Sequence, residues 1–462
     1  MQTFTDDTIC ALATGSGPAA ISVIRLSGPE AVTICNRVFK GKDLTQVSSH
    51  TIHFGTIRND DNSILDEVLV SVFLNPNSYT GEDVIEISCH GSPFIRQEVI
   101  NLLMTKGARM AKPGEFTLRA FLNQKLDLSQ AEAVADLINA DSEASHRLAM
   151  QQMRGGFSNE IGKLRQQLID FASLIELELD FSEEDVEFAD RDALNRLLLK
   201  LHQLTYDLIR SFKVGNVMKN GVPVVIAGKP NAGKSTLLNQ LLKDERAIVS
   251  DIAGTTRDVI EDEMVLDGIV FRFFDTAGIR ETQDTVEAIG VQKTLEKIHA
   301  AAIVIYLFDV NDMEPDELQT IVTDLQQQTD QNNAQLLVVA NKIDGHSTEE
   351  LQQRYPFIEN PVFIAAKSGT GITELEKRLT DFVNTSAVGN EDVVVTNSRH
   401  YEALVNANEA LLRGHQGLEN GITGDFIAMD IRQALHYLGE ITGEITNDDL
   451  LGNIFANFCI GK

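Results

Sequence analysis

The segment GKPNAGKS at positions 228–235 fits G-x-x-x-x-G-K-[ST], the pattern of a phosphate-binding loop. An apolar run at 224–227 precedes it and the helix-favouring run STLLNQLL follows it, so the pattern has the strand–loop–helix context that phosphate binding requires. Its glycines let backbone N–H groups converge on phosphate oxygens at a helix N-terminus. We expect Lys234 to contact the β- and γ-phosphates of a nucleotide and the hydroxyl of Ser235 to ligate Mg²⁺. The residues predicted to line this loop are Gly228, Asn231, Ala232, Gly233, Lys234, Ser235 and Thr236.

A second motif, N-K-x-D, stands directly after the apolar run at 336–340 and comprises Asn341, Lys342 and Asp344. A carboxylate that accepts from two adjacent N–H groups fits the guanine edge, whereas it leaves the acceptor of adenine unpaired. N-K-x-D alone is a weak pattern, but downstream of a phosphate loop it predicts guanine recognition. Ala365, Ala366 and Lys367 are expected to close over the base.

Two segments between these motifs, DIAGTTRD (251–258) and DTAG (275–278), supply the remaining groups. Asp275 ends a predicted strand, where its carboxylate can hold the Mg²⁺ shell, and Gly278 offers an N–H to the γ-phosphate. The GTP-binding residues predicted in this region are Ser250, Asp251, Ile252, Ala253, Gly254, Thr255, Thr256, Asp275, Thr276, Ala277 and Gly278. Because all five elements occur in order, residues 217–384 are predicted to be a GTPase domain.

Two details distinguish this domain from ordinary signalling GTPases. Ile279 follows DTAG, and an aliphatic side chain cannot orient a water molecule, so another group must position the nucleophile. Asn231 lies inside the phosphate loop, where its amide oxygen can hold a monovalent cation against the phosphates. Such a cation would stabilise transition-state charge in the way that an arginine finger does.

The elements that position these residues fall into distinct classes along the chain. Up to about residue 118, short β-rich runs at 20–26, 68–74 and 84–88 and a helical run at 98–104 indicate an α+β module. Apolar residues then recur at helical spacing through 131–138, 161–175 and 197–208, and again at 401–411 and 427–438. Between these parts, strand-like runs alternate with helices, which predicts a mostly parallel, Ras-like α/β sheet. The predicted fold is therefore multidomain: an α+β domain (1–118), a discontinuous helical domain (119–216 and 385–462) and an inserted α/β GTPase domain (217–384).

Composition restricts the classes of function. The 462 residues are 43% hydrophobic and carry a formal net charge of −29, which indicates folded domains without bulk electrostatic attraction for nucleic acid. Four scattered cysteines predict neither a disulfide framework nor a zinc site, and they favour a reducing, cytoplasmic location. The acidic residues Asp6 and Asp7 near the start, and apolar runs too short to span a bilayer, predict no signal peptide and no membrane anchor.

Over residues 1–462, the chain resembles a known family, the MnmE (TrmE) tRNA-modifying GTPases. The motifs that carry the resemblance are SYTGEDVIE (78–86), PGEFTLRAFLNQKLDLSQAEAVADLI (113–138), GKPNAGKST (228–236), DIAGTTRD (251–258), DTAGIRET (275–282) and FCIGK (458–462). The resemblance implies a homodimer that pairs with the flavoprotein MnmG as a heterotetramer. Together they would install a (carboxymethyl)aminomethyl-type group at C5 of the wobble uridine of tRNA. The chain departs from the family at Gln124, where glycine is common, and at Ala365, where serine is common.

The resemblance also implies roles for single residues. Asn231, Ser250, Ile252 and Thr255 would hold K⁺, and Ser235 and Thr256 would hold Mg²⁺. Glu287 would orient water in place of the missing glutamine, although without the family we would interpret it as a solvated helix residue.

A tetrahydrofolate, in its 5-formyl or 5,10-methylene form, would supply the one-carbon unit. The resemblance assigns Arg25, Glu82, Lys125 and Lys462 to its pocket, in which basic groups meet the glutamate tail and a carboxylate pairs with the pterin amino edge. Each of these four residues, taken singly, would be interpreted as a surface charge. Cys459 matches the terminal cysteine of the family, a nucleophile candidate towards uracil; the alternative is an ordinary small buried residue.

Two hypotheses explain residues 217–384 equally well. The first is a K⁺-dependent GTPase whose hydrolysis drives tRNA modification, and the second is a nucleotide-switched binding module such as a ribosome-assembly GTPase. The N-terminal module and the CIGK terminus favour the first, because an assembly factor has no evident use for them. The net charge of −29 counts against direct tRNA binding, so we expect the flavoprotein partner to present most of the basic surface.

Overall fold

The computed structural model describes residues 7–180, 191–244, 262–274, 301–332, 334–386, 393–446, 448–456 and 458–461. The chain divides into two compact units. One unit comprises Met1–Ile138, Gln151–His202 and Asn406–Lys462, and the other comprises Asn139–Met150 and Gln203–Val405. Each unit is described by itself.

The first part of unit 1 is an α+β module built on a seven-stranded sheet with the order β3-β4-β5-β6-β2-β1-β7. Neighbouring strands are antiparallel, except that β7 runs parallel to β1. The strands are β1 (Ile9–Leu12), β2 (Ile21–Ser27), β3 (Phe39–Lys40), β4 (Thr51–Arg58), β5 (Ile64–Phe73), β6 (Val84–His90) and β7 (Arg109–Met110). Helices α1 (Ala31–Val38) and α2 (Pro93–Thr105) pack on the sheet and share its apolar core. The α+β prediction is confirmed, and the strands that short-range patterns missed are β1, β3, β4 and β7.

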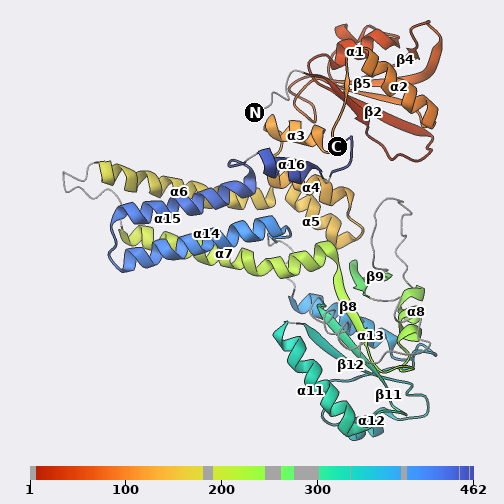
Figure 1. Ribbon diagram of the computed structural model, residues 1–462, viewed down its shortest axis with the longest axis vertical. Coiled ribbons are helices and arrows are strands. Elements are labelled where there is room, and N and C mark those ends of the chain that lie inside the picture. Colours follow the sequence, from red (N-terminus) through yellow and green to blue (C-terminus); the bar gives the residue numbers. More distant parts are fainter. Residues whose placement is uncertain are drawn as a thin grey trace. The chain divides into compact units, whose positions relative to one another are not determined.

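The rest of unit 1 is helical. Its helices include α3 (Glu115–Leu122), α4 (Leu128–Ile138), α6 (Gly156–Asp180), α15 (Gly424–Thr442) and α16 (Asp448–Ala456). Helix α15 packs along α6, so apolar stripes on either side of the inserted domain bury each other (Figure 1). This pairing confirms the prediction that helical segments far apart in the sequence lie next to each other in space.

Three further helices contribute residues to both units: α5 (Glu143–Met153), α7 (Arg191–Asn220) and α14 (Ser398–Glu419). In unit 1 the Nδ1 atom of His202 on α7 lies 2.8 Å from Oδ1 of Asn408 on α14. In unit 2 the backbone N–H of Val395 donates to Oγ of Ser211 on α7, at 3.0 Å.

Unit 2 contains a six-stranded sheet with the order β13-β12-β11-β8-β10-β9. The strands are β8 (Val222–Ala227), β9 (Asp262–Leu266), β10 (Ile269–Phe273), β11 (Ile303–Asp309), β12 (Gln335–Asn341) and β13 (Val362–Phe363). The helices are α8 (Lys234–Asp244), α11 (Pro315–Gln331), α12 (Thr348–Arg354) and α13 (Ile372–Ser386). All strand pairs are parallel except β9 with β10, which confirms the mostly parallel sheet. Within the described residues, no helix is long and apolar enough to cross a membrane.

Candidate functional site: a phosphate loop and a charged N-terminal cluster

The phosphate loop connects the end of β8 to the start of α8, as the sequence predicts. Gly228 has φ +152°, and a Cβ added there would lie 2.1 Å from the backbone oxygen of Leu307 on the adjacent strand β11. Gly233 has φ +102°, and its Cβ would lie 2.3 Å from Nδ2 of Asn341. These two positions require glycine because the loop runs directly against its neighbours.

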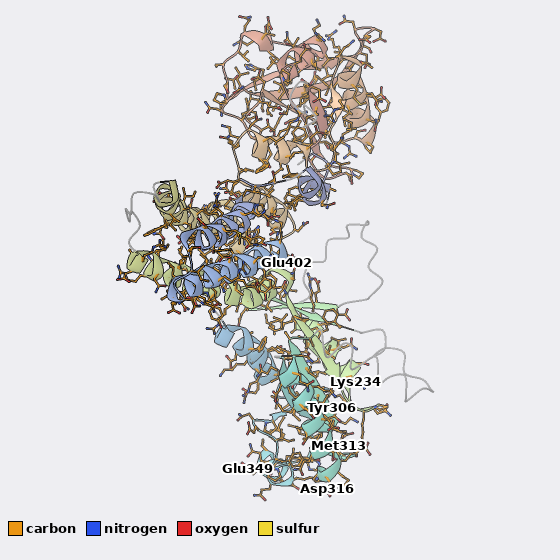
Figure 2. All side chains as sticks on the ribbon, turned by 60° about the vertical axis from the view of Figure 1, so that its left-hand side comes forward. Lys234, Tyr306, Met313, Asp316, Glu349 and Glu402 are labelled. Atoms are coloured by element: carbon orange, nitrogen blue, oxygen red, sulfur yellow. The ribbon has the colours of Figure 1, made fainter. Side chains whose placement is uncertain are left out.

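Lys234, labelled in Figure 2, begins α8. Its ammonium turns back over the loop. The Nζ atom donates to the backbone oxygens of Gly228 at 2.7 Å and Lys229 at 2.9 Å. Burial lowers the pKa of this ammonium, since desolvation penalises its charged form. A phosphate beside Lys234 would offset that penalty, which fits its predicted contact with the β- and γ-phosphates.

The N-K-x-D motif is joined to the loop by the side chain of Asn341. Nδ2 of Asn341 donates to the backbone oxygen of Ala232 at 2.7 Å, and Oδ1 accepts from the backbone N–H of Ala366 at 3.0 Å. The structure therefore brings together the phosphate loop, the N-K-x-D motif and the segment predicted to close over the base. In the same region Asp344 and Lys367 are exposed, whereas Ala365 and Ala366 are buried.

The next residue, Lys342, pairs with Asp309 at the end of β11, with Nζ 2.7 Å from Oδ2. Burial raises the pKa of Asp309, but hydrogen bonds from Lys342 and Asn311 outweigh it, and the net pKa is lowered. Asp309 is a site residue that the sequence patterns did not single out. Strands β11 and β12 pair in parallel with Asp309 opposite Asn341, and this pairing places Asp309 beside the N-K-x-D motif.

A pocket of about 300 Å³ lies beside the phosphate loop. The residues that line it are Lys229, Pro230, Asn231, Ala232, Asp309, Asp312 and Met313. Asn231, the predicted cation ligand, is an exposed residue with φ +63°. Lys229 Nζ lies 2.5 Å from Oε1 of Glu317, so the loop is also tied to α11.

Several predicted site residues lie outside the described part of the chain. They are Ser250, Asp251, Ile252, Ala253, Gly254, Thr255, Thr256, Asp275, Thr276, Ala277, Gly278, Glu287 and Lys462. Ser235 and Thr236 are described and lie in the first turn of α8.

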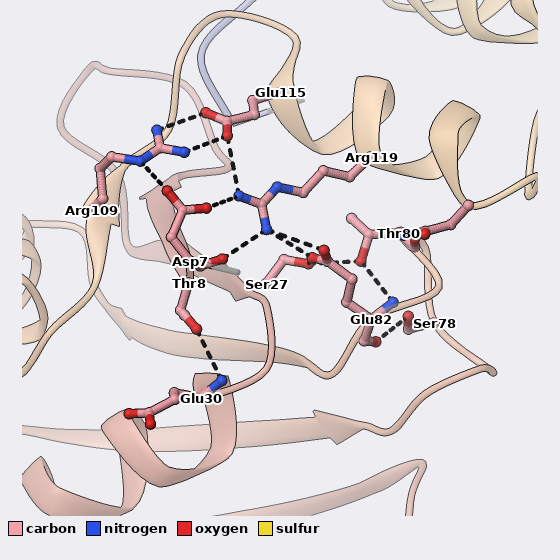
Figure 3. Close-up of polar contacts among 11 residues, drawn as sticks. Asp7, Thr8, Ser27, Glu30, Ser78, Thr80, Glu82, Arg109, Glu115 and Arg119 are labelled. Carbon is pink, nitrogen blue, oxygen red and sulfur yellow. Dashed lines mark hydrogen bonds and ion pairs between the residues drawn. The ribbon is translucent and has the colours of Figure 1, made fainter. Parts of the chain in front are cut away.

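In unit 1, the predicted residue Glu82 belongs to a charged cluster under the loop at 78–82 (Figure 3). Its carboxylate accepts from Oγ of Ser27 at 2.6 Å and from the guanidinium of Arg119 at 3.1 Å. Arg119 also contacts Asp7 at 2.6 Å and Glu115 at 3.2 Å. Sequence patterns did not single out Arg119, Asp7 or Glu115 as site residues, although the family motif at 113–138 contains two of them.

Arg25 lies in the same region, on β2. Its guanidinium pairs with Glu86 at 2.7 Å and lies over the rings of Tyr79 and Phe116, with centroid distances of 5.4 and 5.7 Å. It also donates to the backbone oxygen of Gly461 at 3.4 Å, so the C-terminal tail reaches the N-terminal module within one subunit.

Two other predicted residues border this region. A Cβ added to Gly81 would lie 3.2 Å from Cε of the exposed Lys125, which places the Lys125 stem beside the loop that carries Glu82. Cys459 is exposed, so the alternative of a small buried residue is wrong. Its backbone oxygen accepts from the N–H of Gly114 at 3.4 Å.

The strand–loop–helix geometry and the sheet topology define a phosphate-loop GTPase domain inserted into a larger chain. The family model described as "GTP-binding protein TrmE N-terminus" matches residues 8–125, and the model described as "MnmE helical domain" matches residues 128–459. This chain belongs to the MnmE (TrmE) family of tRNA modification GTPases.

Curated relatives with the name tRNA modification GTPase MnmE match over nearly the whole chain. The protein of Flavobacterium johnsoniae is 59% identical over 464 residues, covering 99% of each chain. That of Cytophaga hutchinsonii is 56% identical, covering 99% of this chain and 98% of its own.

Two solved structures are similar to part of the chain. The G domain of the T. maritima FeoB iron transporter is 21% identical, covers 35% of this chain and 98% of its own, and has a TM-score of 0.26. Era in complex with MgGDPNP and nucleotides of 16S ribosomal RNA is 27% identical, covers 41% of this chain and 66% of its own, and has a TM-score of 0.26.

Proposed function

We propose that this chain is a K⁺-dependent GTPase that uses hydrolysis to drive modification of the wobble uridine of tRNA at C5. The observation that carries the proposal is the phosphate loop joined to N-K-x-D through Asn341, in a chain that is similar over its full length to tRNA modification GTPases. GTP binds through this loop, and the Asp344 carboxylate accepts from the guanine edge.

The cation requirement is supported by Asn231. Its positive φ and exposure leave the amide available beside the loop, where K⁺ stabilises charge in the transition state. Ser250, Ile252 and Thr255 complete the proposed K⁺ site, Ser235 and Thr256 hold Mg²⁺, and Glu287 orients the attacking water.

The second substrate site takes a tetrahydrofolate. Arg25, flanked by two aromatic rings, and Lys125 suit an anionic, aromatic ligand, and the carboxylate of Glu82 suits the amino edge of a pterin. Lys462 follows Gly461, whose backbone oxygen contacts Arg25, which supports its assignment to the same pocket. The folate supplies the one-carbon unit, and the exposed thiol of Cys459 is the proposed nucleophile towards uracil.

The proposed assembly is a homodimer paired with the flavoprotein MnmG. Ile52, Phe54 and Leu69 on β4 and β5 are 65%, 66% and 47% exposed, and Phe54 lies opposite Leu69 in the strand pairing. This apolar patch suits a second copy of the chain. With a net charge of −29, the chain leaves most of the tRNA contact to its partner.

The test measures GTP hydrolysis by the purified full chain in KCl and then in NaCl at equal ionic strength. We expect faster hydrolysis in K⁺, and loss of that difference in Asn231→Ala. Asn216→Ala, on the exposed face of α7, is the matched control and should keep the K⁺ dependence. Equal turnover in both salts contradicts the K⁺ proposal. A reconstituted mixture with MnmG, GTP, K⁺, folate, an amine donor and tRNA that leaves the wobble uridine unmodified contradicts the modification itself.

A further inference from the structure

Arg119 is a buried cation that contacts three acidic residues at once. Its side chain is 2% exposed and extends from α3 into the cluster formed by Asp7, Glu82 and Glu115 (Figure 3). The side chain of Glu115 is also 2% exposed, whereas that of Glu82 is 14% exposed. The side chain of Asp7 is 46% exposed, so the cluster is closed around Arg119 and Glu115 and partly open at Glu82 and Asp7.

The two ends of the guanidinium have different partners. Nη1 of Arg119 donates to both carboxylate oxygens of Glu82 at 3.1 Å and to the backbone oxygen of Asp7 at 2.9 Å. Nη2 donates to Oδ1 of Asp7 at 2.6 Å and to Oε1 of Glu115 at 3.2 Å. Asp7 and Glu115 thus hold the guanidinium by its Nη2 end, while the Nη1 end holds Glu82.

A second guanidinium, that of Arg109, provides an internal comparison. It contacts Asp7 at 2.6 Å and Glu115 at 2.6 Å, on the side away from Glu82. In the described part of the chain, Arg119 is the cation paired with Glu82. Two guanidiniums among three carboxylates leave one net negative charge. Arg109 and Arg119 share Asp7 and Glu115, whereas the described ion pair of Glu82 is with Arg119.

We infer that Arg119 is the positioning residue of the proposed folate site: it holds the carboxylate of Glu82 in the orientation that accepts the N–H groups of the pterin. This inference rests on the proposed function. Oγ of Ser27, 2.6 Å from Oε2 of Glu82, and Oγ of Ser78, which donates to the backbone oxygen of Glu82 at 2.5 Å, hold the same residue from other directions. In this inference Arg119 acts on the folate through Glu82 and not by direct contact.

The planar fork of arginine is what this position requires. The two terminal nitrogens of a guanidinium, Nη1 and Nη2, carry N–H donors that point to separate acceptors. A lysine ammonium is instead a compact point charge. A lysine at position 119 keeps the positive charge but cannot hold the Asp7–Glu115 pair and Glu82 together. Glu82 then loses its fixed orientation while the cluster keeps its charge balance.

The test is a double-mutant cycle read by calorimetric titration of the full chain with 5-formyltetrahydrofolate. We expect Glu82→Gln and Arg119→Lys each to weaken binding by roughly 10-fold or more, because the first removes the carboxylate and the second removes its fixed orientation. The double variant should bind within about 2-fold of Glu82→Gln alone, since Arg119 acts through Glu82. Arg109→Lys is the matched control, because it changes the other guanidinium of the cluster. Any change that it causes in folate affinity should multiply with the change caused by Glu82→Gln.

The inference is overturned if the affinity losses of Arg119→Lys and Glu82→Gln multiply in the double variant. A merely structural arginine would weaken binding whichever residue stands at position 82. Thermal unfolding is followed for every variant. If Arg119→Lys does not fold, the combination of Arg119→Gln with Glu115→Gln takes its place in the cycle. This combination removes one charge of each sign from the cluster. Absence of folate binding by the unchanged chain overturns both the folate proposal and the inference. If folate binding depends on Glu82 but the affinity losses of the Glu82 and Arg119 variants multiply, the inference alone is overturned and the folate proposal stands.

Discussion

The side-chain amide of Asn341 donates to the backbone oxygen of Ala232 at 2.7 Å, although the two residues are 109 positions apart. The carbonyl end of the same amide accepts from the backbone N–H of Ala366. One asparagine therefore holds the phosphate loop and the segment predicted to cover the base in fixed positions. A buried side chain therefore joins the segments predicted to bind the phosphates and the base.

The first prediction concerns this connection. Asn341→Ala leaves the oxygen of Ala232 and the N–H of Ala366 without their side-chain partner, at a cost of about 1–3 kcal/mol for each buried group. We expect GTP affinity to fall roughly 10- to 100-fold, measured with a fluorescent GTP analogue. Asn216→Ala is the control, because that amide is exposed on α7 and accepts from Nδ2 of Asn220 instead. An unchanged affinity in Asn341→Ala would show that the loop holds its shape without this contact.

The second prediction concerns Glu287, which lies outside the described residues. If Glu287 orients the attacking water, Glu287→Ala slows hydrolysis roughly 100-fold or more and leaves GTP affinity within about 2-fold, because only the transition state is affected. Single-turnover hydrolysis and equilibrium binding measure the two quantities separately. Glu349→Ala, at an exposed position on α12, should change neither. A parallel loss of binding in Glu287→Ala would make that residue structural.

The third prediction concerns the C-terminal tail. Gly461 has φ +98°, and a Cβ there would lie 2.1 Å from the backbone oxygen of Leu12. Gly461→Ala should therefore displace the tail from Arg25 and weaken folate binding, as should deletion of residues 459–462, while basal GTP hydrolysis persists. Gly452→Ala is the control, since a Cβ on that helical residue meets nothing within 4 Å. A truncated chain that still modifies tRNA with its flavoprotein partner would assign the tail to packing alone.

The fourth prediction concerns the thiols. Burial raises the pKa of Cys10 and Cys89 to about 11 and that of Cys35 to about 12, whereas Cys459 is exposed. Because the thiolate is the reactive form, a thiol reagent at pH 7.5 should label one cysteine per folded chain. Cys459→Ser should abolish this labelling, and denaturant should expose the remaining three thiols. Labelling of Cys459→Ser at the original rate would mean that a buried thiol opens to solvent.

The fifth prediction concerns acid stability. Burial raises the pKa of Glu115, but the hydrogen bonds from Arg109 and the N–H of Lys112 outweigh it, and the net pKa is lowered. A carboxyl whose pKa is lower in the folded state contributes stability above its unfolded value of about 4.3, and this contribution is lost as pH falls through the folded value.

Glu115→Gln should therefore destabilise unit 1 by about 3 kcal/mol at pH 7, with the difference from the parent shrinking below about pH 4. Thermal unfolding across pH 3–7 measures this effect. Glu160→Gln, in an exposed pair on α6, is the control with little expected change. A destabilisation that stays constant down to pH 3 would show that the Glu115 charge is not its cause.

The sequence by itself determined the features that depend on contiguous residues. The phosphate loop, the N-K-x-D motif and the helical stripes of α6 and α15 are recognisable because a loop between a strand and a helix, or one face of a helix, is defined by spacing within a few residues. The change from helix to strand at Gly221 is likewise local: α7 ends at Asn220, Gly221 has φ +82°, and β8 begins at Val222. Gln124, noted as a departure from the family glycine, has φ +56°, the conformation in which glycine is least strained.

Only the tertiary structure decided which charges meet. Arg119 reaches Asp7 across 112 positions and Arg25 reaches Gly461 across 436, and no periodicity relates such distant residues. Strand order, the register between β11 and β12, and the return of the tail to β1 bring these groups together. Ion pairing depends on distance in space, so residues that look like separate surface charges in the sequence become one buried cluster around Glu82 when the sheet and α3 assemble.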